Sequence, residues 1–462
     1  MRKYAVFGAP ILHSKSPEIY NFLFKYDGID AHYTRVFAKT SNEVLKIFLD
    51  FNLSGANITS PLKKNILTIC NSLSDEAKNT GAVNTILYNQ EYTQGPFQGF
   101  NTDVLGFWYT LYDELKNILT DSGDTQIQNK KIAIIGAGGA ADAVASALIK
   151  NTHNCQINII NRTYDKALIL ADKYNLEPIR FDTFSSAQAQ NYDIIIITIP
   201  APENSLSKID FSKKSILIFA DYRCNEYFQK LKQQNIRAVS GHNWLINQAV
   251  LVYKIYNSKN KLTKTKTSTP DIIPLLNNLL NSTQDLNSNT LPYNTNIYLT
   301  GFSGAGKSFL GAKLAEKLNS NFIDLDKLIE DSAGKSIQKI FSEDGEDFFR
   351  KTELQLFEKI TNTNYFKNKS NKYNIISLGA GFDLTLINSI KKKEKIIYLY
   401  SELKESLERI KNSNVSRPKL QNLNHKEILN IYTQRKEKYF NNSDFIIYSN
   451  NNTLENLLSE LR

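Results

Sequence analysis

Hydrophobic residues along the chain fall into short runs of strand length, separated by longer stretches with helical spacing. The clearest strand-like runs cover residues 4–7, 55–58, 131–135, 157–160, 194–197, 216–219 and 296–300. A long helix is predicted over residues 104–119, and a shorter amphipathic helix over residues 271–281. Because strands that alternate with helices favour parallel sheets and right-handed crossovers, the pattern predicts an α/β protein.

The chain is too long for one compact domain, since its 462 residues are about three times the usual ~150. Residues 257–296 are rich in Asn, Thr, Ser and Lys and contain three prolines, which is typical of a closing segment followed by a linker. We therefore expect a first region over 1–281 (divided into 1–105, 106–256 and a closing segment 257–281), a linker over 282–295 and a last region over 296–462.

The charge balance favours small anionic ligands. Lys and Arg exceed Asp and Glu by 56 to 46, giving a net charge of +10, but the basic residues are scattered. This scatter argues against a nucleic-acid surface. No apolar run approaches the ~20 residues of a membrane span. The chain enters a strand pattern at once, which argues against a secretory signal, and its three cysteines are too far apart for a disulfide framework. We therefore expect a cytoplasmic protein. The sequence leaves the oligomeric state open.

A glycine-rich loop follows the strand-like run at 131–135. Such a loop lets the backbone approach a pyrophosphate, which the following helix N-terminus stabilises. The residues expected to bind a dinucleotide here are Gly136, Gly138, Gly139 and Ala140.

The end of the next strand indicates which dinucleotide is bound. An NAD-binding domain usually places Asp or Glu there, whereas this chain has Asn161, Arg162 and Thr163. A guanidinium binds a 2′-phosphate well, so the sequence predicts NADP(H). The alternative is that Arg162 is an ordinary surface arginine.

A second phosphate-binding motif follows the strand at 296–300. The pattern G-x-x-x-x-G-K-S is that of a P-loop, whose backbone amides cradle phosphates, whose lysine reaches the β- and γ-phosphates and whose serine binds Mg²⁺. It predicts an ATP site with Mg²⁺, formed by Gly301, Gly304, Ala305, Gly306, Lys307 and Ser308.

Residues 1–281 resemble the shikimate dehydrogenases, on seven motifs in the family's order: 8–17 (GAPILHSKSP), 55–63 (GANITSPLK), 81–85 (GAVNT), 101–103 (NTD), 136–140 (GAGGA), 161–163 (NRT) and 248–249 (QA). The resemblance implies that Lys63 and Asp103 form the catalytic pair. It also implies that the substrate is held by Ser14, Ser16, Thr59, Asn84 and Gln248. Taken singly, Ser14 could cap a helix and Lys63 could be a solvated lysine like Lys64.

Residues 296–462 resemble shikimate kinase, on the P-loop and on 322–330 (FIDLDKLIE), 337–350 (IQKIFSEDGEDFFR) with Glu353, 379–381 (GAG), 417–418 (RP) and 435–439 (RKEKY). The resemblance implies that Asp326, Arg350 and Arg435 hold the acceptor and that Asp326 is catalytic. It also implies that the backbone of Gly381 approaches the acceptor. Finally, it implies that Asp324 supports Mg²⁺ and that Arg417 lies on a lid over ATP. Alternatively, Arg350 and Arg435 could form surface ion pairs with Glu353 or Glu437.

Four places depart from the family patterns: residues 197–200, Cys224, Ala380 and Lys419. The predicted fold is an N-terminal α/β substrate domain plus a Rossmann NADP-binding domain, followed by a P-loop α/β domain like those of nucleoside monophosphate kinases. The implied function is reduction of 3-dehydroshikimate by NADPH, then phosphorylation of shikimate by ATP. The alternatives are a quinate/shikimate dehydrogenase fused to a kinase for another small acid, or to a nucleotide-binding regulatory domain without turnover.

Overall fold

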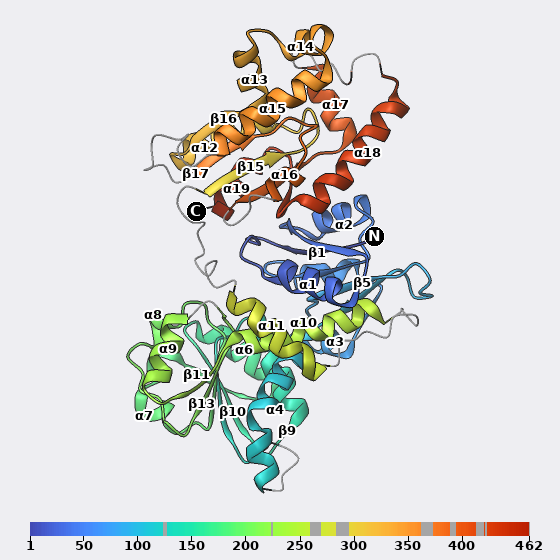
Figure 1. Ribbon diagram of the computed structural model, residues 1–462. Coiled ribbons are helices and arrows are strands. Elements are labelled where there is room, and N and C mark those ends of the chain that lie inside the picture. Colours follow the sequence, from blue (N-terminus) through green and yellow to red (C-terminus); the bar gives the residue numbers. More distant parts are fainter. Residues whose placement is uncertain are drawn as a thin grey trace. The chain divides into compact units, whose positions relative to one another are not determined.

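The computed structural model describes residues 1–122, 127–222, 225–258, 269–282, 295–361, 373–388, 394–412, 420 and 423–461 (Figure 1). The chain forms two compact units. The first unit contains Met1–Tyr4, Glu18–Ala31 and Thr40–Asn287, and the second contains Ala5–Pro17, His32–Lys39 and Ser288–Arg462. This division differs from the predicted one, because two N-terminal segments belong to the second unit. Within the predicted linker, residues 283–294 lie outside the described residues.

A small mixed sheet begins the first unit, with the strand order β3-β5-β6-β4. Strands β3 and β5, and β5 and β6, are antiparallel, so the prediction of parallel sheets alone was wrong here. The cause is a hairpin in which residues 89–96 join β5 to β6 with no crossover helix. The elements of this region are α1 (Ser16–Asp27), α2 (Ser41–Asp50), β3 (Gly55–Ile58), η1 (Asn65–Ile69), β4 (Ser72–Leu73), α3 (Asp75–Thr80), β5 (Thr85–Tyr88) and β6 (Phe97–Phe100).

A six-stranded parallel sheet follows, with the order β11-β10-β8-β12-β13-β14 that places the glycine-rich loop at the carboxyl end of its third strand. Strand β12 consists of four buried isoleucines, as expected for a strand covered on both faces. The main elements are β8 (Lys131–Ile135), α5 (Gly139–Asn151), β10 (Gln156–Asn161), α6 (Tyr164–Tyr174), β11 (Glu177–Arg180), β12 (Ile194–Ile197), β13 (Ile216–Phe219), α9 (Asn225–Gln233) and β14 (Arg237–Val239). The shorter ones are β7 (Ile127–Gln128), β9 (Thr152–His153), η2 (Phe181–Thr183), α7 (Ser186–Ala189) and α8 (Glu203–Leu206).

Long helices join the two sheets of the first unit. Helix α4 (Thr102–Ser122) packs against α10 (Gly241–Asn257), and α11 (Thr269–Ser282) packs against α10 in turn (Figure 1). Gly106 allows the close approach of α4 and α10, because a Cβ atom there would lie 2.7 Å from Cβ of Gln248. The glycine therefore determines how near Gln248 comes to the start of α4.

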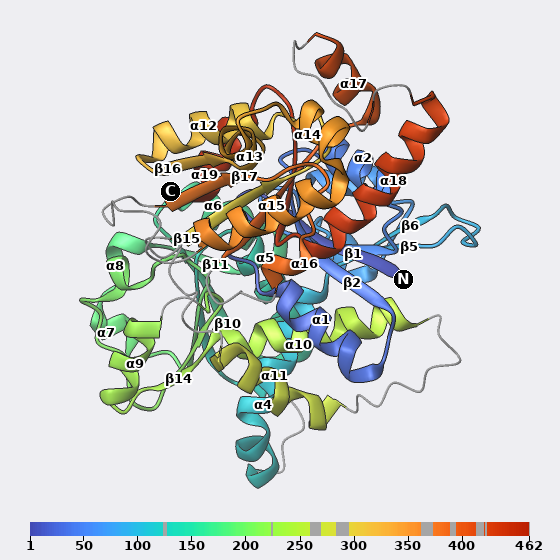
Figure 2. The same cartoon turned by 45° about the horizontal axis from the view of Figure 1, so that its top comes forward.

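The second unit contains a six-stranded parallel sheet with the order β16-β17-β15-β18-β19-β2. Helix α12 packs against β16 and β17, as Figure 2 shows. Strand β1 (Arg2–Gly8) is divided between the units after Tyr4. The other elements are β2 (Ala31–Phe37), β15 (Thr295–Thr300), α12 (Lys307–Leu318), β16 (Asn321–Asp324), α13 (Leu325–Ala333), α14 (Ile337–Glu343), α15 (Gly345–Thr361), β17 (Tyr373–Ser377), α16 (Thr385–Asn388), β18 (Lys395–Tyr400), α17 (Leu403–Lys411), α18 (His425–Asn442), β19 (Phe445–Tyr448) and α19 (Thr453–Leu461).

A half-buried ion pair links the two sheets of the first unit. Lys173 on α6 donates to both carboxylate oxygens of Asp142 on α5, at 2.8 and 3.0 Å, and to the carbonyl of Thr80 at the end of α3, at 3.0 Å. The Tyr174 hydroxyl donates to the same carboxylate at 2.6 Å. Because Asp142 is 8% exposed, the Lys173 ammonium compensates a largely desolvated negative charge. The same ammonium provides a hydrogen-bond donor for the carbonyl at the C-terminus of α3.

We predict that Lys173→Ala lowers the free energy of unfolding of the first unit by about 1–3 kcal/mol, because Asp142 loses its cation. Both tryptophans of the chain, Trp108 and Trp244, lie in the first unit, so tryptophan fluorescence during urea unfolding reports on this unit. The matched control is Lys150→Ala, which removes the exposed Lys150–Glu76 pair between α5 and α3 and should cost less than about 0.5 kcal/mol. Equal losses in the two variants would contradict the prediction.

Candidate active sites

The predicted catalytic pair of the dehydrogenase-like region is formed in the structure. Lys63 precedes η1, and Asp103 lies in the first turn of α4. The Lys63 Nζ is 2.5 Å from Asp103 Oδ2, and the two side chains are 28% and 11% exposed. The Lys63 carbonyl accepts a hydrogen bond from the amide of Val83 at 2.8 Å, which anchors its backbone. Lys63 is therefore an ion-paired side chain, unlike exposed Lys64.

Asn84 fixes the other oxygen of the Asp103 carboxylate. Its Nδ2 donates to Asp103 Oδ1 at 2.9 Å, to Thr102 Oγ1 at 3.0 Å and to Gln248 Oε1 at 3.5 Å. Its Oδ1 accepts hydrogen bonds from the Thr102 amide and the Thr85 hydroxyl, both at 2.9 Å. Asn84 is buried, so the amide orients the carboxylate toward Lys63.

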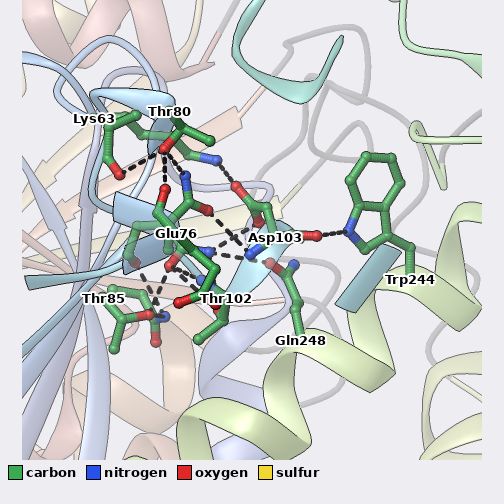
Figure 3. A network of polar contacts seen from close by, with 12 residues as sticks. Lys63, Glu76, Thr80, Thr85, Thr102, Asp103, Trp244 and Gln248 are labelled. Atoms are coloured by element: carbon green, nitrogen blue, oxygen red, sulfur yellow. Dashed lines mark hydrogen bonds and ion pairs between the residues drawn. The ribbon is translucent and has the colours of Figure 1, made fainter. Parts of the chain in front are cut away.

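The backbone of Asp103 is held from both sides. Its carbonyl accepts from the Trp244 indole nitrogen at 3.0 Å, and its amide donates to Asn101 Oδ1 at 3.2 Å. Figure 3 shows Lys63 and Trp244 approaching Asp103 from opposite sides. The Asn-Thr-Asp motif was a sequence signal for Asn101. No sequence pattern pointed to Trp244, which comes from α10 and is distant along the chain.

The remaining predicted substrate ligands occupy separate places. Thr59 follows β3, is half-buried, and its carbonyl accepts from the Leu62 amide at 2.9 Å. Ser14 and Ser16 belong to the second unit. The Ser14 hydroxyl lies 3.3 Å from that of Ser16, which begins α1, so the two hydroxyls are adjacent.

The glycine-rich loop has the geometry of a phosphate-binding turn. Gly136 has a φ of +122°, and a Cβ atom there would lie 2.2 Å from the Thr198 hydroxyl. Thr198 belongs to the segment 197–200 that departs from the family pattern, and it donates to the Ile135 carbonyl at 2.9 Å. Gly138 caps α5, and no heavy atom of the described structure lies within 4 Å of Cβ positions built on Gly138 or Gly139. This exposed helix N-terminus fits a pyrophosphate.

The loop after β10 presents cations to solvent. Arg162 is exposed, and the side-chain amide of Asn161 donates to the Thr163 carbonyl at 2.9 Å, which fixes the turn. The neighbouring strand ends at Arg180, which is in register with Asn161 and stacks 4.6 Å above the Tyr164 ring. No sequence motif pointed to Arg180. Two arginines beside one loop fit the extra phosphate of NADP.

In the second unit the P-loop joins β15 to α12. Gly301, Gly304 and Gly306 have φ values of +150°, +82° and +89°, and a Cβ atom on Gly304 would lie 2.4 Å from the Ser406 carbonyl oxygen. Lys307 is 9% exposed, and its Nζ donates to the carbonyls of Gly301 and Phe302 at 3.0 and 3.3 Å. The ammonium thus lies inside the loop that is expected to surround phosphates.

Ser377 connects the two residues predicted to support Mg²⁺. The Ser308 hydroxyl is 3.5 Å from that of Ser377, and Asp324 is in register with Ser377 on the adjacent strand. Among the described residues no group of three His, Cys, Asp or Glu side chains could hold a metal ion alone. Magnesium that arrives with ATP needs only one or two protein oxygens, so Ser308 and Asp324 fit it.

The acceptor side of the kinase-like region is a cavity of about 750 Å³. It is lined by the P-loop and by all four predicted acceptor residues, Asp326, Arg350, Gly381 and Arg435. A Cβ atom on Gly381 would lie 2.8 Å from Arg350 Nη2 and 3.5 Å from Arg435 Nη2. Both guanidinium groups therefore converge on one glycine, as required to clamp a carboxylate.

Two further residues complete this cavity. Arg350 forms an ion pair with Glu353, but Glu353 is buried and both residues line the cavity, so this pair is not the surface ion pair of the alternative. The Tyr439 hydroxyl donates to the carbonyl of Ala380 at 2.5 Å and holds the segment in which Ala380 replaces a glycine. The matched motifs contained Glu353 and Tyr439, yet the prediction gave neither a role. Arg417, Lys419 and Cys224 lie outside the described residues.

No helix in the described ranges is both long and apolar enough to cross a membrane.

Three family models match successive parts of the chain. Residues 6–86 match the shikimate dehydrogenase substrate-binding domain, residues 118–219 match shikimate/quinate 5-dehydrogenase, and residues 303–462 match shikimate kinase.

Individual relatives agree with these matches. A shikimate dehydrogenase (NADP(+)) of Blochmanniella pennsylvanica is 34% identical over 247 residues, which cover 49% of this chain and 80% of the relative. The pentafunctional AROM polypeptide of Yarrowia lipolytica is 34% identical over 216 residues, covering 46% of this chain and 13% of the relative. The crystal structure of shikimate dehydrogenase from Aquifex aeolicus superposes with a TM-score of 0.50 at 25% identity, over 61% of this chain and 97% of that one. The chain therefore belongs to the shikimate dehydrogenase family and also carries a shikimate kinase domain over residues 303–462.

Proposed function

We propose that this chain catalyses two consecutive reactions: NADPH-dependent reduction of 3-dehydroshikimate to shikimate, and transfer of the γ-phosphoryl group of ATP to shikimate, giving shikimate 3-phosphate. The observation that carries the proposal is that each set of motif residues converges in space. Lys63, Asp103 and Asn84 form one polar network. Asp326, Arg350 and Arg435 line one cavity with the P-loop.

In the reduction, Lys63 is the proton donor to the ketone oxygen. NADPH, when bound, supplies a hydride to the carbonyl carbon. The addition of this hydride places negative charge on the ketone oxygen. The Lys63 ammonium gives a proton to the oxygen as the charge develops, and Asp103 keeps the ammonium in position through the 2.5 Å contact. Asn84 prevents the Asp103 carboxylate from rotating away.

In the phosphorylation, the chain positions the acceptor and neutralises charge. Lys307 contacts the β- and γ-phosphates of ATP, and Arg350 and Arg435 clamp the shikimate carboxylate. Asp326 orients the attacking hydroxyl and accepts its proton. Ser308 and Asp324 would hold the Mg²⁺ ion that shields the phosphate charge.

The alternatives predict different products. A chain that also oxidises quinate at a comparable rate would be a quinate/shikimate dehydrogenase, and a chain that binds MgATP but phosphorylates no acid would have a regulatory C-terminal region. Incubating the full chain with 3-dehydroshikimate, NADPH and MgATP, and separately with quinate, NADP+ and MgATP, and identifying the products by mass spectrometry, separates these cases.

Lys63→Ala should lower kcat for 3-dehydroshikimate reduction by roughly 10²-fold or more, because the developing alkoxide loses its proton donor. Steady-state NADPH oxidation measures the effect. Lys64→Ala is the matched control, since Lys64 is the exposed neighbour and should be neutral. Kinase activity in the same variant should be unchanged. Reduction within twofold of the parent in Lys63→Ala would rule out its assigned role.

Arg162→Ala should raise KM for NADPH by roughly 10-fold or more and change KM for NADH little, because only NADPH carries the 2′-phosphate that a guanidinium binds. Initial rates with both cofactors at saturating 3-dehydroshikimate give the comparison. If both KM values rise equally, Arg162 supports the loop and does not select the cofactor.

Asp326→Asn should remove most shikimate phosphorylation, with kcat lowered roughly 10²-fold, while ATP affinity stays near that of the parent because the P-loop is unchanged. Product formation and nucleotide titration are measured on the same preparation. Asp331→Asn, an exposed aspartate on the same helix α13, is the matched control and should be neutral. Unchanged phosphorylation in Asp326→Asn would exclude Asp326 as the acceptor base.

A further inference from the structure

A continuous series of side-chain hydrogen bonds runs from helix α10 to the Asp103 carboxylate, entirely within the first unit. It begins at Tyr256 on α10, whose hydroxyl donates to Asn57 Oδ1 on β3 at 3.1 Å. Asn57 Nδ2 donates to the hydroxyl of Thr85 on β5 at 3.1 Å, and that hydroxyl donates to Asn84 Oδ1 at 2.9 Å. Asn84 Nδ2 in turn donates to Asp103 Oδ1 at 2.9 Å (Figure 3).

The donors and acceptors of this series can be arranged in one direction only. Asn57 Nδ2 also donates to the Asn84 backbone carbonyl at 3.3 Å; because a carbonyl only accepts, Asn57 Oδ1 must face Tyr256. The Thr102 backbone amide only donates, and it binds Asn84 Oδ1 at 2.9 Å, so Asn84 Nδ2 must face Asp103. Every donor therefore points toward the Asp103 carboxylate, and successive bonds of this kind polarise and strengthen one another.

The Tyr256 side chain is held tightly at the far end of the series. Tyr256 is 3% exposed, and its ring centroid lies 4.4 Å from that of Tyr4. Gly55 makes room for the ring, because a Cβ atom there would lie 2.7 Å from Tyr256 Cε1. Tyr20 also hydrogen-bonds the Asn57 side chain, so Asn57 keeps a partner when the Tyr256 hydroxyl is removed. A phenylalanine would fill the same space, so the hydroxyl is what the series requires.

We propose that Tyr256 is a positioning residue for the reduction, and that it acts on the proton donor Lys63 through this series of hydrogen bonds. Its hydroxyl polarises the series from the far end and strengthens the bond from Asn84 to Asp103. The Asp103 carboxylate is thereby kept from rotating away from the Lys63 ammonium. The inference rests on the proposed function, in which Lys63 gives its proton to the ketone oxygen. It deepens that function by adding a residue that no sequence motif contained.

The test compares two buried tyrosines of α10 in the full chain. Tyr256→Phe keeps the ring and removes the hydroxyl, so kcat for 3-dehydroshikimate reduction should fall about fivefold, the value of one lost hydrogen bond. KM for NADPH and the rate of shikimate phosphorylation should stay within about twofold. Tyr253→Phe is the matched control, because it removes a buried hydroxyl that donates to Asp27 Oδ2 at 2.6 Å instead, and kcat should be unchanged.

A double-mutant cycle shows whether the effect passes through the middle of the series. Thr85→Val removes the hydroxyl that accepts from Asn57 and donates to Asn84, so it should lower kcat at least as much as Tyr256→Phe. If Tyr256 acts through this hydroxyl, the double variant should lose clearly less than the product of the two separate losses. Losses that multiply would overturn the inference, since Tyr256 would then act independently of Thr85.

Amide hydrogen exchange gives a readout that does not require turnover. Because the Thr102 amide donates to the Asn84 side chain, exchange over residues 101–104 should be faster in Tyr256→Phe than in the parent and unchanged in Tyr253→Phe. A kcat within twofold of the parent or unchanged exchange in Tyr256→Phe would overturn the inference, and so would equal losses in Tyr253→Phe. If the parent does not reduce 3-dehydroshikimate, the proposed function fails, and the exchange comparison still decides whether Tyr256 holds this network.

Discussion

The short contact between Lys63 and Asp103 is the constraint around which the first unit is organised. Each polar group of Asp103 has a hydrogen-bond partner. Lys63 and Asn84 contact the two carboxylate oxygens, and Trp244 and Asn101 contact the backbone carbonyl and amide. These partners come from the region of the small mixed sheet, from the loop before α4 and from α10. The close packing of α4 on α10 at Gly106 is needed for them to meet. The fixed position of the Lys63 ammonium is thus the result of packing over the whole unit.

The two reactions make different demands on the protein, and the two sites reflect this. Ketone reduction needs one proton donor at a defined atom, so its site is a small network of neutral amides and hydroxyls around a single ion pair. Phosphoryl transfer must neutralise several charges at once, so its site gathers Lys307, Arg350 and Arg435 around one cavity. The buried acid Glu353 partly compensates one of these cations, Arg350.

The sequence predicted the parts whose signals are local. Strand-length apolar runs gave β3, β12 and β13 with their exact bounds, and the glycine-rich loops were found because each follows a strand directly. The antiparallel hairpin of β5 and β6 was missed because its strands, TILY and FQGF, lack the uninterrupted apolar runs that marked β12 and β13. Trp244 and Arg180 could not be predicted, since each contacts a residue that is distant in sequence and neither belongs to a motif. The site residues themselves were found by resemblance; their spacing alone would not have identified them.

The parallel pairing of β2 with β19 protects the kinase domain against self-association. Strand β19 is buried and apolar, with Phe445, Ile446 and Ile447 almost fully covered. In the second unit its free hydrogen-bonding side is occupied by residues 35–37 of β2. A fragment that begins after the linker would lack β2 and would present an unpaired strand rich in β-branched and aromatic residues, which is a template for pairing with another chain. Residues from the start of the chain thus act as an intramolecular edge guard for a domain encoded at its end.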